Sequence, residues 1–352
     1  MTRRHYGLLI MGAVLALSLT GCSRTPEDTL QDYVQRLGRS LQVDPVLWQV
    51  SLPAPLPSRR SLLLREPALS INVLEFLSLS GCELGRVLGA NNSSLGKLAQ
   101  PSQKLHLQRD LLLSAPQCIE ILRADNPELA DRLADLMQTK YKARMIYWWN
   151  AWFTAHEWRA FQSLSEGAIL LPDDPRSDET LMAARQSLDY LLRQGERWQA
   201  GQFEYDSSAM ERHQQQMLAT AAIGRWRYAN AALTAMSRAA ADTLDKRIGA
   251  RPLCPAGKKT PQAEILQNVF HKYYAGIVQP YLSLTDRFGS DLIHALSRVR
   301  KLAGEITPQE WRDLEETLKL ERQVMLTEHR RHVTKWQDIL AQCGMMPGSQ
   351  AG

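Results

Sequence analysis

Apolar side chains recur along most of this chain at the three- and four-residue spacing of amphipathic helices. The first such set follows the helix-start signal Thr25-Pro26 and comprises Leu30, Tyr33, Val34, Leu37 and Leu41. Similar patterns predict helices over 178–200, 206–249, 261–302 and 308–341, the last starting with a capping box at Thr307. The alanine-rich run 217–241 predicts close packing, with Arg225 and Arg227 on its solvated side. Because no alternating β-branched run occurs, we expect an all-α, elongated bundle of long helices.

Breaks in this pattern predict how the chain is organised. Five prolines between residues 44 and 69 favour an extended connector. One apolar helix is expected over 70–89, and a long helix from Asn126 is expected to run past Phe161. The Pro172–Pro175 segment is the clearest mid-chain break. We therefore expect a signal peptide at 1–21, an N-terminal helix and connector at 22–69, helical lobes at 70–175 and 176–345, and a flexible tail at 346–352.

The first 22 residues have the pattern of a secretion signal. Arg3 and Arg4 precede an apolar run from Leu8 to Leu19, which is shorter than the about 20 residues that span a bilayer. The segment ends in Leu-Thr-Gly-Cys, which resembles a bacterial lipobox and implies cleavage before Cys22 and acyl chains on its thiol. An unlipidated signal peptide and an uncleaved membrane helix are the alternatives. Ser23, rather than an aspartate, favours the outer membrane, facing the periplasm, over the inner membrane.

The cysteine count fits an oxidising compartment. Once Cys22 is assigned to lipid, four cysteines remain, and they permit three pairings. We favour Cys82–Cys118 and Cys254–Cys343, because each pair brackets one sequence-local block; free buried cysteines are the alternative. The formal net charge of +5 falls by two, to +3, without residues 1–21 and their two arginines. This mild charge does not by itself suggest nucleic acid as a partner.

A stretch of the first helical lobe carries a family resemblance. Within residues 71–113, an apolar helix with Cys82 precedes the matching positions Asn92, Ser93, Leu95, Gly96, Pro101 and Ser102. Together with the lipobox, this arrangement resembles a group of uncharacterised gammaproteobacterial lipoproteins that share a domain of unknown function. The resemblance implies a helical periplasmic lipoprotein and carries no activity with it.

Three short motifs resemble known chemical signatures without completing them. Ser94 and Lys97 match the S-x-x-K of penicillin-binding proteins, but no convincing S-x-N or K-T-G partner exists, and a polar turn explains them. Residues 257–260 lack the earlier glycine of a phosphate loop. His329 and His332 lack further ligands for a metal, and we expect them to be solvated or capped. The sequence therefore predicts no catalytic residue, no metal site and no cofactor.

Aromatic residues are unusually dense between Tyr141 and Phe161. They cover most sides of the predicted helix, which favours a buried core. The alternative is a glycan-binding surface, because exposed tryptophans stack on sugars and nearby cationic side chains suit anionic glycans. Under that alternative the candidate ligand contacts are Asn92, Ser93, Ser94, Lys97, Ser102, Arg144, Trp148 and Trp152.

These features predict a membrane-anchored, periplasm-facing lipoprotein of unknown function, which we expect to be a non-enzymatic structural or interaction protein of the cell envelope. Its expected partners are the membrane, through the lipid on Cys22, and an envelope protein or peptidoglycan. Nucleic acid is not expected. The alternative is a peptidoglycan- or lipopolysaccharide-binding protein or a cell-wall enzyme.

Overall fold

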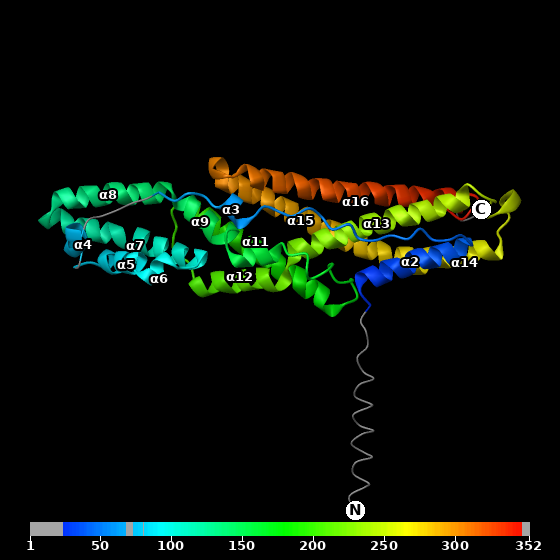
Figure 1. Ribbon diagram of the computed structural model, residues 1–352, viewed down its shortest axis with the longest axis horizontal. Helices are drawn as coiled ribbons and strands as arrows, with labels where there is room; N and C mark the ends of the chain where they lie inside the picture. Colours follow the sequence, from blue (N-terminus) through cyan, green and yellow to red (C-terminus); the bar gives the residue numbers. More distant parts are fainter. Residues whose placement is uncertain (1–23, 68–72, 80, 347–352) are drawn as a thin grey trace, which may run out of the picture.

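The computed structural model describes residues 24–67, 73–79 and 81–346, which form an elongated molecule built from helices (Figure 1). No strand occurs within those ranges, and the predicted all-α fold is confirmed. The signal segment 1–21, Cys22 and the end of the tail, 347–352, lie outside the described residues.

Helix α2 (Pro26–Leu41) begins as the sequence predicts. The hydroxyl of Thr25 accepts a hydrogen bond from the backbone N–H of Asp28, whose carboxylate accepts one from the N–H of Thr25. Its buried face, which includes Leu30 and Leu37, packs against α13 (Ala222–Ile248) and α14 (Pro261–Val269). The first described helix is thus part of the main body.

The proline-rich connector lies along this body as an extended strap over residues 43–67, with the short helix α3 (Arg59–Leu62) inside it (Figure 1). The amide of Val46 donates to the hydroxyl of Thr243 on α13 at 3.0 Å. The amide of Leu64 donates to the side chain of Asn150 at 2.9 Å. These bonds fix the strap at two places.

A small hydrophobic core lies at one end of the molecule (Figure 1). The helices in this region are α4 (Val73–Ser78), α5 (Glu83–Asn92), α6 (Ser94–Lys97), α7 (Pro101–Asp125) and α8 (Pro127–Lys142). The disulfide Cys82–Cys118 has the predicted pairing and joins the start of α5 to α7. The single helix expected over 70–89 is wrong, because the chain turns between α4 and α5. Gly85 permits the turn, since a Cβ atom there would lie 2.3 Å from the carbonyl oxygen of Leu79.

The long helix predicted from Asn126 past Phe161 is also wrong. Three helices cover this range, namely α8, α9 (Arg144–Phe153) and α10 (His156–Phe161). Helix α9 ends where the hydroxyl of Thr154 donates to the carbonyl of Asn150 at 2.7 Å. The backbone N–H of Thr154, the C-cap residue of α9, bonds to the same carbonyl.

Helices α11 (Pro175–Gln199), α12 (Ser207–Thr220) and α13 follow. The single helix expected over 206–249 is interrupted at Ala221, which has a positive φ of 44° and separates α12 from α13. Helix α13 starts against the backbone of the loop after α10, because a Cβ atom on Gly224 would lie 1.8 Å from the carbonyl oxygen of Ser163. This close approach coincides with the break.

Helix α13 is buried along much of its length, as its alanine content predicts. The expectation that Arg227 faces solvent is wrong, because its side chain is only 1% exposed. Its guanidinium pairs with Glu321 on α16 (Gln309–Ala341) and donates to the carbonyl of Ala54 on the strap. Arg225 is partly buried beside Glu166.

The C-terminal part is a helical hairpin. Helices α14, η2 (Phe270–Val278) and α15 (Gln279–Ala303) follow one another without a break, and η2 consists of π-helical turns. After η3 (Gly304–Ile306), α16 returns antiparallel to α15 and lies parallel to α13, since Arg227 pairs with Glu321 and Asp245 with Lys335 (Figure 1). The disulfide Cys254–Cys343 closes the hairpin with the predicted pairing, next to η1 (Pro255–Gly257). No capping box forms at Thr307, because Pro308 is the N-cap residue and has no side-chain acceptor.

A second, larger hydrophobic core fills the rest of the molecule. It contains fully buried tryptophans from several helices, including Trp149, Trp226 and Trp311. Side chains from both sides of the Pro172–Pro175 segment contribute to it. The division of the chain into helical lobes at residues 70–175 and 176–345 stays a prediction.

Candidate functional site

The polar turn that the sequence singled out lies between α5 and α7. Ser93 closes it, because its hydroxyl donates to the carbonyl of Ala90 at 2.7 Å and accepts from the amide of Gly96 at 3.0 Å. Asn92 and Ser94 are exposed, and Ser102 is half-buried in the first turn of α7. The backbone of Lys97 ends α6, and its side chain is outside what the structure describes. These bonds give Ser93 a structural role in the turn.

The aromatic helix α9 is core, as the first interpretation of the sequence predicts. Trp148 and Trp152 are 0% and 1% exposed, and the Trp152 indole donates to the side chain of Gln194 at 2.6 Å. The alternative in which these two tryptophans stack on a glycan is therefore not supported. The guanidinium of Arg144 donates to carbonyls of the last turn of α11, at 2.8 Å for Gln199. This is the position of a helix C-terminal cap.

A cluster that the sequence did not predict lies where α2, η2 and α16 meet. The Trp336 indole donates to the hydroxyl of Tyr33 at 2.8 Å, and that hydroxyl lies 2.7 Å from Nε2 of His332. The Tyr33 hydroxyl thus accepts from the indole and shares a second hydrogen bond with the imidazole, whose direction depends on the tautomer of His332. Among the described residues Nδ1 of His332 has no hydrogen-bond partner.

The electrostatics of this cluster follow from its burial. His332 is 0% exposed, and burial, with a smaller effect of His329, lowers its pKa to about 3. Burial also lowers the pKa of His329, raises the pKa of Tyr274 to about 12, and raises the pKa of Tyr33 well above its usual value. The expectation of a solvated or capped His332 is wrong. The cluster is neutral at pH 7. The hydrogen bonds of Tyr33 join α2 to α16, and the hydroxyl of Tyr274 on η2 lies 3.3 Å from Nε2 of His329 on α16.

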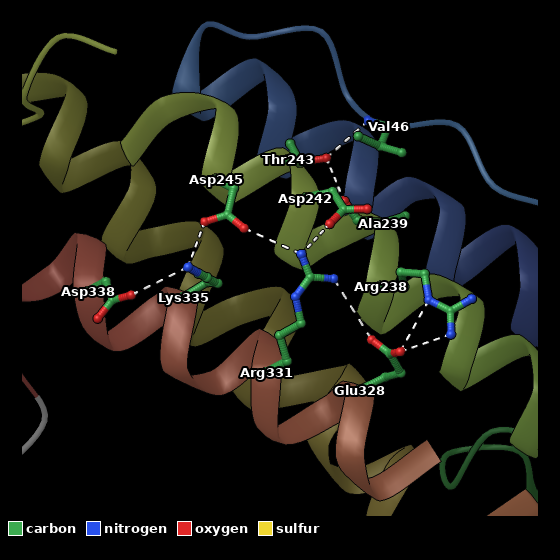
Figure 2. A network of polar contacts seen from close by, with 10 residues as sticks. All are labelled: Val46, Arg238, Ala239, Asp242, Thr243, Asp245, Glu328, Arg331, Lys335 and Asp338. Atoms are coloured by element: carbon green, nitrogen blue, oxygen red, sulfur yellow. Dashed lines mark hydrogen bonds and ion pairs between the residues drawn. The ribbon is translucent and has the colours of Figure 1, made fainter. Parts of the chain in front are cut away.

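The most prominent charged cluster also joins elements of the body (Figure 2). Arg331 on α16 reaches Asp242 and Asp245 on α13, and Lys335 contacts Asp245 at 2.8 Å. One turn away, Arg238 on α13 pairs with Glu328 at 2.8 Å. Charges of both signs alternate and neutralise one another, so this network aligns two long helices and does not form a surface of one sign for a charged ligand.

The described residues offer no metal centre, since no group of three or more His, Cys, Asp or Glu side chains there could hold an ion. The helices formed by those residues also include none with the length and apolar character that a bilayer crossing requires.

A groove of about 760 Å³ lies beside the start of α2. Its walls are the first turns of α2, the loop 166–175 and the segment from Gly276 to Pro280, and its apolar lining includes Pro26, Leu170, Leu171, Ile277 and Pro280. Figure 1 shows this loop next to the start of α2. No sequence signal could have identified this groove, because segments more than 100 residues apart form it.

Arginines surround the apolar groove, and each has a carboxylate nearby. Arg24 lies 3.7 Å from Asp32, Arg176 lies 2.6 Å from Asp174, and Arg225 lies 3.5 Å from Glu166. The hydrogen bonds with Arg176 lower the pKa of Asp174 to about 2. Glu27 and Asp173 also line the groove, so four carboxylates accompany the three arginines and no excess of positive charge favours an anion.

Comparison with known proteins gives one result. No curated protein and no solved structure matches the chain. A family model described as "Protein of unknown function (DUF3080)" matches residues 30–347, which span almost all of the described body. The chain therefore belongs to this family, for which the description states no function.

Proposed function

We propose that this protein is a non-enzymatic, lipid-anchored scaffold that lies at the outer membrane and faces the periplasm. The observation that carries the proposal is the short chain between Cys22 and the folded body. Helix α2 begins at Pro26, and Leu30 is already buried in the core. Four residues span at most about 14 Å when extended. A lipid on Cys22 would therefore hold the body directly against the bilayer.

The place of the anchor favours a particular orientation. Helix α2 starts part way along one long side of the molecule, away from both of its ends (Figure 1). A tether at this point favours a body that lies along the membrane. Its opposite long side is then available to an envelope protein.

The contacts of the body fit a rigid scaffold better than an enzyme. The charged side chains in Figure 2 align α13 with α16, and disulfides close both the small core and the C-terminal hairpin. The alternative of a peptidoglycan- or lipopolysaccharide-binding protein, or of a cell-wall enzyme, has less support. Trp148 and Trp152 are buried, and Arg144 is used at the end of α11.

Membrane fractionation of cells that make the full-length chain tests the anchor. We expect the wild type in the outer-membrane fraction and Cys22→Ala in the soluble fraction, because each lost acyl methylene removes about 0.8 kcal/mol of membrane affinity. A Ser23→Asp variant is the matched control, since it keeps the lipid and is expected to change only the membrane. Persistent membrane association of Cys22→Ala would contradict the proposal.

In-cell crosslinking followed by mass spectrometry tests the scaffold role. We expect the membrane-bound wild type to capture a recurrent envelope protein, and Cys22→Ala to lose that product. Capture of glycan fragments alone would favour the glycan-binding alternative instead.

A further inference from the structure

The groove beside α2 begins at the point where the proposed anchor is attached. Its lining starts at Arg24, two residues after Cys22. Two residues span at most about 7 Å. A thioether on Cys22 would therefore lie within about 7 Å of Arg24, close enough for its acyl chains to reach the lining.

The lining contains an apolar part that suits an acyl chain, beside the charged side chains of three arginines and four carboxylates. Leu170, Leu171 and Ile277 are half-buried, so each presents part of its apolar surface to the groove. Gly276 has no side chain to fill the space beside Ile277. A volume of about 760 Å³ lies within the range of about 300–1,000 Å³ that is typical of small-molecule sites.

The charges around the groove argue against a phosphate as its main ligand. Arg176 and Arg225 have their own carboxylates, so an entering phosphate would have to displace Asp174 or Glu166. An acyl chain needs no such exchange, and it would gain by leaving water.

We propose that this groove binds one of the acyl chains of Cys22 whenever the protein is away from a bilayer. The inference rests on the proposed lipid anchor. In water the chain lies against Leu171 and Ile277, and in a membrane it leaves the groove for the bilayer. The groove thus keeps the anchor partly shielded until it inserts.

Photocrosslinking of the full lipidated protein tests this inference. A benzophenone-bearing phenylalanine replaces Leu171 or Ile277, on two walls of the groove, and the purified protein is irradiated after removal of detergent. We expect a peptide that joins the probe to the acylated N-terminal peptide. Adding vesicles of phosphatidylethanolamine and phosphatidylglycerol should abolish that product.

Two controls make the result specific. A probe at the exposed Ile265 on α14, twelve residues before Ile277, should give no such product. The substitution Ile277→Asn, combined with the probe at Leu171, should lose it while the thermal unfolding temperature stays close to that of the probe protein alone.

The possible outcomes separate the inference from the anchor on which it rests. Intact mass shows whether Cys22 carries acyl chains, and their absence would overturn both. Acylated protein that gives no product in the groove, or equal product at Ile265, would overturn the inference and leave the anchor intact. Crosslinks to vesicle phospholipid alone would overturn it too, because the groove would then be a phospholipid site.

Discussion

The buried ion pair between Arg227 and Glu321 offers the sharpest test of how the body is held together. The Arg227 side chain is 1% exposed, whereas that of Glu321 is 20% exposed. Nε of Arg227 lies 3.0 Å from one carboxylate oxygen, and a terminal nitrogen donates to the carbonyl of Ala54 at 2.8 Å. One side chain therefore connects α13, α16 and the strap.

These exposures predict an asymmetry between the two single substitutions. Glu321→Met leaves a buried guanidinium with the Ala54 carbonyl as its one hydrogen-bond partner among the described residues, which should cost about 3–5 kcal/mol of unfolding free energy. Arg227→Met leaves a carboxylate that water can reach, together with one unsatisfied carbonyl, and should cost about 1–3 kcal/mol. The double variant replaces the pair by apolar side chains and should be close to the wild type or more stable.

Denaturant unfolding of the four proteins measures this double-mutant cycle. The exposed pair Arg298–Glu196 is the matched control, and Glu196→Met should cost less than about 1 kcal/mol. The reasoning is refuted if Glu321→Met costs no more than this control. It is also refuted if the two single costs simply add in the double variant, because the charges would then not be coupled.

Three further predictions concern the histidine cluster, the helix contacts and the disulfides. Burial lowers the pKa of His332 to about 3 in the folded state, against about 6.5 when unfolded, so its contribution to stability is complete above pH 6.5 and is lost as pH falls toward 3. Denaturant unfolding should therefore show about 2 kcal/mol less stability at pH 5.0 than at pH 7.5. The substitution His332→Gln should reduce this difference. Gly224→Ala should cost about 1–3 kcal/mol or more in thermal unfolding, because its Cβ atom would meet the carbonyl of Ser163. Gly249→Ala should change little, because its Cβ atom would lie 3.4 Å from the carbonyl oxygen of Asp245. Equal melting temperatures would contradict the assigned contact. Reduction should raise the intact mass by four hydrogens, about 4 Da, and no mass change would mean that the cysteines are free thiols.

Local sequence was enough to predict the helices whose starts and apolar faces lie within a few turns of chain. Thr25 and Asp28 define the start of α2, and the C-terminal hairpin follows from the apolar spacing of its two long segments. The disulfide pairing was accessible for the same reason, since antiparallel neighbours bring Cys254 and Cys343 together. The density of aromatic residues in α9 was enough to predict burial, because little of that helix could face water.

The helix breaks and the buried polar groups depend on contacts between distant parts of the chain. Ala221 has good helix propensity, yet the helix is interrupted there, next to the close contact between Gly224 and the backbone of Ser163. Charge alone places Arg227 in solvent, and its burial is tolerable because a carboxylate 94 residues away and the Ala54 carbonyl both accept from it. His332 has its partner Tyr33 299 residues away. The sequence by itself thus determined the fold class, the favoured cysteine pairs and the residue proposed for lipidation. Only the tertiary structure decided where helices end, which charges are buried and where the groove lies, because these features depend on which distant surfaces meet.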